Sequence, residues 1–291
     1  MTGLALALVL SSALAHATWN LLVKRAINPQ AFTLWLLLTS SVLLLPVVAV
    51  VAWRYPVVGP GWWFILGTAS IHVLYFTFLS RAYAAGDLSL VYPIARGMGP
   101  MLAPAMGVLL LKERVAPLAM VGIAAVVVGI YTVHWAGRLR QLRTDPLGIL
   151  KQKGTRYAIL TGLVIAAYSV WDKQGVKYVH PLFYMYMLHL GAMLGYGPLV
   201  LRTVGLQALR VEWRANAWRT VLAGLLTFLA YVMVLTALQT TRVSYVSPAR
   251  EVGIAFAVLL GIVVLKEPFG RGRLLGAAFI LAGLVLIALS P

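Results

Sequence analysis

The sequence predicts an all-α integral membrane protein of ten transmembrane helices, arranged as two inverted five-helix repeats. Of the 291 residues, 62% are hydrophobic and 11% are charged, whereas soluble domains carry about 25% charged residues. Ten segments are apolar over the ~20 residues that an α-helix needs to cross about 30 Å of hydrocarbon. In addition, one distinctive pattern occurs twice at matched spacing.

The repeated pattern joins an arginine to a distant Lys-Glu pair. Residues 89–114 and 243–268 each contain Val-x-Pro, then Ala-Arg, a long apolar run and Leu-Lys-Glu. Arg96 precedes Glu113 by 17 residues, and Arg250 precedes Glu267 by the same 17 residues. This matched spacing indicates an internal duplication.

The predicted spans are separated by short connections that carry Pro, Gly or charged residues. They cover residues 3–23, 31–53, 62–83, 88–111, 116–136, 156–177, 181–201, 217–239, 244–265 and 272–289. One long basic connection divides the chain into a first repeat, 1–136, an inter-repeat loop, 137–155, and a second repeat, 156–291. Residues 202–216 are predicted to form an amphipathic helix at the membrane surface.

The segment 1–17 resembles a signal peptide, because it ends in Ala-His-Ala. Its start carries no Lys or Arg, which a signal peptide needs, and the duplication requires this segment as a helix. We therefore expect it to be a retained span. With five spans in each repeat, the second copy enters the membrane from the opposite side. This plan is common in secondary transporters, whose substrate site lies near the midplane between the halves.

The net charge of +17 would favour a nucleic-acid partner in a soluble protein. In a membrane protein it is typical of basic loops that face the cytoplasm and anionic lipid, so we expect a lipid bilayer and no nucleic acid. The face that holds both termini collects Arg54, Lys112, Arg114, Lys173, Lys177 and Arg242, and the opposite face collects every other Lys and Arg except Arg96 and Arg250. The positive-inside rule then places both termini outside.

Two five-span halves, a proline near the start of each fourth span, the Leu-Lys-Glu endings and the Gly-rich fifth spans MVGIAAVVVGIYTV and LLGAAFILAGLVLIAL resemble the EamA-type transporters of the drug/metabolite transporter superfamily. The resemblance covers essentially the whole chain. It implies ten helices and transport of small metabolites by alternating access, often coupled to protons, but no particular substrate. It also implies cytoplasmic termini, which conflicts with the charge count. We favour the charge count and leave the conflict open.

The first helix of each half carries a matched triad. His16, Trp19 and Asn20 correspond, at a constant offset of 152, to the second triad, which consists of Tyr168, Trp171 and Asp172. The spacing i, i+3, i+4 puts each triad on one helical face. We expect both faces to line a central cavity and bind substrate; the alternative is an interfacial Trp belt with polar groups that bond neighbouring helices.

Charged residues within the spans are candidates for function. Arg96 and Arg250 are expected to bind an anionic part of the substrate or to clamp a gate; alternatively, they bond carbonyls freed by the nearby prolines. Asp172 is a candidate for proton coupling, because an unpaired carboxylate is costly in the bilayer, unless it lies with Lys173 among the headgroups. Glu251 is a further candidate for coupling or gating.

Inversion is expected to divide these charges between the two faces. Asp172, Arg250 and Glu251 should lie towards the face of the termini, and we predict a direct Arg250–Asp172 pair there. The remaining polar candidates, His16, Asn20 and Arg96, should lie towards the other face. Tyr75 and Tyr231 are expected either to line the pocket, where their rings could hold an amine, or to serve packing alone.

The sequence favours a transporter over an enzyme. It has no phosphate-binding loop, metalloprotease motif or nucleophile elbow, and without cysteine it has no thiolate site; we expect no cofactor and no metal. We predict a secondary active exporter of a small polar metabolite, amino acid-like or amphipathic, in a bacterial inner membrane, with proton coupling and either a monomeric or a homodimeric state left open. The alternatives are an importer of small anions such as phosphonates or sugar phosphates and, in another class, a lipid translocase or a membrane scaffold.

Overall fold

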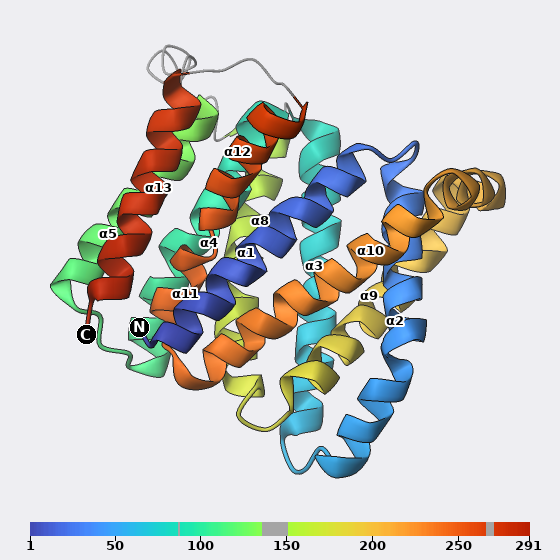
Figure 1. Cartoon of the computed structure of the whole chain (residues 1–291), viewed down its shortest axis with the longest axis horizontal. Helices are drawn as coiled ribbons and strands as arrows, with labels where there is room; N and C mark the ends of the chain where they lie inside the picture. The colour runs from blue at the N-terminus through green and yellow to red at the C-terminus, as the bar shows by residue number, and fades with distance from the viewer. Residues whose placement is uncertain (87, 136–150, 266–270) are drawn as a thin grey trace.

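The computed structural model describes residues 1–86, 88–135, 151–265 and 271–291, and this part of the chain is helical without strands (Figure 1). The first half contains α1 (Gly3–Lys24), α2 (Pro29–Arg54), α3 (Gly61–Ala85), α4 (Leu88–Leu111) and α5 (Pro117–Trp135). The second half contains α8 (Lys153–Gly175), α9 (Pro181–Thr203), α10 (Gly205–Thr240), α11 (Val243–Ala249), α12 (Val252–Leu265) and α13 (Arg271–Leu289). The predicted all-α fold is confirmed. Most of the predicted loop 137–155 lies outside the described residues.

Each predicted span corresponds to a helix, except that the ninth is divided between α11 and α12. Seven of the helical stretches in the described residues are long and apolar enough to cross a membrane. Helix α8 is less apolar than the other helices, and it packs on α3 and α4.

The two halves are related by an inverted pseudo-twofold axis. Helix α4 packs on α8 as α12 packs on α1, and α3 packs on α8 as α10 packs on α1. The pairs α5–α13 and α2–α9 join equivalent helices across this axis. The predicted inverted repeat is therefore confirmed, and the interior surfaces are formed mainly between the halves.

Both termini lie on the same side of the bundle (Figure 1), where the Met1 amino group donates a hydrogen bond to the Ser290 carbonyl over 3.2 Å. We call this side the terminal face, and the side on which α1 ends and α2 begins the distal face. The turn at the distal face is fixed by Asn28, whose side chain accepts from the Gln30 and Ala31 amides and so caps α2.

Helix α10 begins before the membrane span and bends at Asn216, whose φ of −131° and ψ of 20° are not helical. The predicted surface segment is helical from Gly205 and is turned away from the rest of α10 (Figure 1). Glu212 holds the bend, because its buried carboxylate accepts hydrogen bonds from the Asn216 side chain at 2.7 Å and the Asn28 amide at 2.6 Å. The bend is thereby tied to the turn between α1 and α2.

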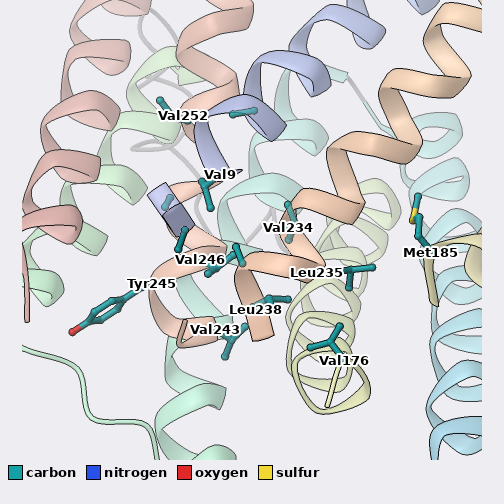
Figure 2. Close-up of a cluster of buried hydrophobic side chains, with 14 of the residues drawn as sticks. Val9, Val176, Met185, Val234, Leu235, Leu238, Val243, Tyr245, Val246 and Val252 are labelled. Carbon is teal, nitrogen blue, oxygen red and sulfur yellow. The ribbon is translucent and has the colours of Figure 1, made fainter. Parts of the chain in front are cut away.

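The core lies where α1 and α10 meet the divided helix α11–α12. Figure 2 shows apolar side chains from all four helices pointing into this junction. They include Val9, Val234, Leu235, Val246 and Val252, each at most 1% exposed. Their burial fixes the position of the α11–α12 break relative to the other helices.

Helices α5 and α13 approach closely along a seam of glycines. A Cβ atom added at Gly129 would lie 2.6 Å from the carbonyl oxygen of Gly276, and one added at Gly122 would lie 2.7 Å from that of Gly283. The two contacts are equivalent under the pseudo-twofold axis. Small residues allow backbones to approach in this way within membranes.

Gly129→Leu should force α5 and α13 apart, because no side chain fits at this crossing. Overpacking of this kind costs about 1–3 kcal/mol. We expect a lower unfolding temperature for the purified protein in detergent. The control is Ala124→Leu, at an exposed position of α5; equal unfolding temperatures for the two variants would contradict the close seam.

Candidate substrate cavity

A cavity of about 370 Å³ lies between the two halves. Its walls come from α1, α2, α3, α4, α8, α9 and α10, together with the break between α11 and α12. Most of the predicted site residues line it: His16, Trp19, Asn20, Tyr75, Arg96, Tyr168, Tyr231 and Arg250. The lining also includes Val23 and Thr33, so the cavity extends to the distal face.

The two triads are used differently. All three residues of the first triad line the cavity, and the Trp19 indole N–H donates to His16 Nδ1 over 3.2 Å. From the second triad only Tyr168 lines it. Trp171 lies instead against α3, where its indole N–H donates to the Phe64 carbonyl over 2.9 Å and its ring covers Gly67. Of the three α8 residues that were predicted to line the cavity, only Tyr168 does so.

Aromatic rings from three helices meet at one wall of the cavity. The His72 ring stacks on Tyr168 with centroids 4.5 Å apart, and Tyr75 meets Tyr168 edge-on at 6.0 Å. Tyr231 lies 6.4 Å from Tyr168. His72 Nδ1 lies 2.8 Å from the Thr68 carbonyl oxygen, and because a carbonyl only accepts, this nitrogen carries the proton.

Asp172 is fully buried behind this wall. Its two carboxylate oxygens accept hydrogen bonds from the hydroxyls of Tyr184 at 2.8 Å and Tyr231 at 2.6 Å. Lys173 points elsewhere, since its ammonium group donates to the Leu238 and Thr241 carbonyls at the end of α10. Asp172 and Lys173 therefore have separate partners, and the Asp172 carboxylate is enclosed by the bundle.

Arg96 and Glu251 form an ion pair at 3.1 Å, which bridges the two groups that were predicted to lie towards opposite faces. Arg96 lies eight residues into α4 from the distal face, and Arg250 seven residues after the start of α11 at the terminal face. At 1.5 Å per residue each is about 11 Å deep in ~30 Å of hydrocarbon. The remaining gap is short enough for an arginine and a glutamate side chain to bridge.

The predicted direct pair between Arg250 and Asp172 is replaced by an indirect connection. The Arg250 guanidinium lies over the Tyr231 ring, 5.2 Å from its centroid, while the hydroxyl of the same tyrosine bonds Asp172. Around Arg250 the helix tightens, and the amides of Glu251 and Gly253 bond carbonyls three residues back. Such a short 3₁₀ stretch within a helix is typical of a hinge.

Polar contacts close the bundle at the terminal face. The Glu113 carboxylate accepts hydrogen bonds from the Val243 amide at 2.9 Å and the Ser244 amide at 3.0 Å, which caps α11. Lys173 caps the end of α10 nearby. Among the described residues, the cavity lining thus reaches the distal face through Val23 and Thr33, whereas these contacts join helices at the terminal face.

Two contributors were missed by the sequence analysis or given a lesser role. Tyr184 was not singled out, although its position near the start of α9, directly after the α8–α9 turn, brings it back to Asp172. His189 of α9 lies 3.1 Å from Ser40 Oγ of α2, and it also lines the cavity.

Tyr184→Phe should destabilise the protein, because Asp172 keeps only the Tyr231 hydroxyl as a partner in its buried site. An unsatisfied buried acceptor costs about 1–3 kcal/mol, so the unfolding temperature in detergent should fall. Tyr178→Phe is the control, since this ring is 44% exposed and stacks on Phe64. If the two variants unfold at the same temperature, the hydroxyl does not stabilise the carboxylate.

Comparison with known proteins agrees with this architecture. The model of the EamA-like transporter family matches residues 3–135 and again residues 152–289. A solved structure titled "Crystal structure of protein" has a TM-score of 0.70 at 16% identity and covers 98% of each chain, which shows a shared fold. No curated protein matches the sequence. Because the family model covers both halves of the chain, the protein belongs to the EamA-like transporter family.

Proposed function

We propose that the protein is a secondary active transporter, which moves a small polar or amphipathic metabolite across a bacterial inner membrane by alternating access. The observation that carries the proposal is the cavity between the two halves, which is lined by both of them and extends to the distal face. Rocking of one half against the other would exchange the open and closed faces around this site. The first triad and Tyr168 line one shared cavity, as a solute carrier requires.

Export is the proposed direction. The distal face is the basic one, so the positive-inside rule favours a cytoplasmic distal face. A cavity that opens there would load its substrate from the cytoplasm. Release would follow when the contacts of Glu113 and Lys173 at the terminal face separate.

Asp172 is the proposed proton-coupling group. A carboxylate accepts hydrogen bonds at both oxygens, whereas a protonated carboxyl group has one oxygen that donates. Protonation therefore changes one of the two tyrosine contacts. The Arg250 guanidinium lies over the ring of the same Tyr231. Protonation of Asp172 can therefore alter the cavity lining through the Tyr231 side chain.

Asp172→Asn should remove proton-driven transport while leaving substrate exchange intact, because an amide cannot titrate. The assay uses the purified protein in liposomes with an inward proton gradient and a panel of amino acids, amines and small organic acids. The wild-type protein is expected to transport one of these classes of compound together with protons. A pH dye trapped inside the liposomes reports the proton movement. Leu163→Ala, at an exposed position of α8, is the control.

Two results would contradict this proposal. Equal proton-driven transport by wild type and Asp172→Asn would remove Asp172 from the coupling step. Scrambling of fluorescent lipids by the same liposomes, without movement of any solute, would favour a lipid translocase.

A further inference from the structure

The cavity presents positive charge to a ligand and no negative charge. Arg96 and Arg250 line it, whereas none of the described lining residues is Asp or Glu. Glu251 and Asp172 lie close by, but they are already engaged by Arg96 and by two tyrosine hydroxyls. A ligand in the cavity therefore meets guanidinium groups and aromatic rings.

The inverted repeat explains why Arg250 differs from its counterpart Arg96. Arg96 pairs with Glu251, and the equivalent pair across the axis would join Arg250 to residue 97. That residue is Gly97, packed so closely under Tyr131 that an added Cβ would lie 3.1 Å from the ring. The chain therefore supplies no acid at the position where symmetry would provide one for Arg250.

Among the described residues, the contact formed by the Arg250 guanidinium is with the face of the Tyr231 ring. A guanidinium stays charged at any depth, and a buried charge without an anion is costly. Its planar donors match carboxylate or phosphonate oxygens in a fork. A ligand anion would thus give Arg250 the partner that Glu251 gives Arg96.

His16 adds a further donor to this end of the cavity. Because the Trp19 indole can only donate, His16 Nδ1 accepts, and in the neutral ring the proton lies on Nε2. His16 lines the cavity together with Arg96 and Arg250. All three side chains can therefore face one anionic ligand, and none of the described lining residues is a carboxylate that would repel it.

The rest of the cavity fits an apolar or aromatic body. Its other walls include Trp19, Tyr75, Leu36, Leu37 and Leu188. A volume of about 370 Å³ is near the lower end of the ~300–1,000 Å³ that is common for ligand sites. An ammonium group would find ring faces here but no carboxylate.

We infer that the transported substrate is a small organic anion, whose carboxylate or phosphonate group is held by Arg250 and whose apolar body lies against the aromatic wall. The inference rests on the proposed function, because it takes this cavity as the transport site. It narrows the proposed substrate class from small polar or amphipathic metabolites to organic anions.

The test measures binding to the full-length purified protein by calorimetry, with four probes that share a phenylethyl body. They are 3-phenylpropanoate, 2-phenylethylphosphonate, phenylalanine and 2-phenylethylamine. The anions should bind, phenylalanine more weakly, and the amine weakest; the two anions together distinguish a carboxylate site from a phosphonate site. Preference for the amine, or binding of neither anion, would overturn the inference.

Substitutions of Arg250 and Glu251 test where the anionic group binds. Arg250→Gln should weaken anion binding by about tenfold or more, as loss of a charge-assisted contact requires. Arg250→Lys should lose less, and Glu251→Gln should bind at least as well as wild type, because it removes a negative charge beside the cavity. Arg202→Gln, exposed at the end of α9, is the control. Unchanged anion binding in Arg250→Gln would overturn the assignment.

A second variant and a neutral probe separate a folding defect from the loss of the anion contact. If Arg250→Gln does not fold, Arg250→Lys carries the test: it should lose affinity for the anions and keep its affinity for the neutral 3-phenylpropanamide. Equal losses for both probes would contradict the assignment. Since binding is measured without a membrane gradient, anion binding without transport would count against the proposed function alone, and transport of amines would count against the inference alone.

Discussion

Partnering of buried charge is the constraint on which the interior of this protein depends. Arg96, Glu251 and Asp172 lie within the helix bundle, where an isolated charge is expensive, and each is held by a contact that crosses between helices. These contacts tie α4 to the α11–α12 break and α8 to both α9 and α10. The packing of the bundle and the chemistry of its cavity therefore rest on the same few side chains.

The internal duplication determines how these buried charges are arranged. Two inverted halves bring Arg96 and Arg250 to similar depths from opposite faces, where one acid is available for two arginines. At the position equivalent to Glu251 the first repeat has Gly97, and the Tyr131 ring packs closely against it. In the same way, the counterpart of the buried Asp172 is Asn20, which lines the cavity near the distal face. The side chains that distinguish the cavity thus lie at positions where the two repeats differ in sequence, within a helix arrangement that both repeats share.

Much of the fold could be predicted, because hydrophobic length and the repeated Arg-to-Glu spacing are local properties of the chain. Both predicted triads were placed on helices, but Trp171 turned away from the cavity because Gly67 opens a space for its ring on α3. The Arg96–Glu251 pair could not be read from the order of the residues, since it depends on how deeply two antiparallel helices overlap. The role of Tyr184 similarly requires the geometry of the α8–α9 turn.

A single introduced cysteine tests the alternating exposure of the cavity directly, because the chain contains no cysteine of its own. Thr227→Cys places a thiol on α10 in the cavity lining. A membrane-impermeant thiol reagent should label it from the distal face at rest, and from the terminal face as well during substrate turnover. Labelling that never occurs from the terminal face, even while substrate is being transported, would contradict the account.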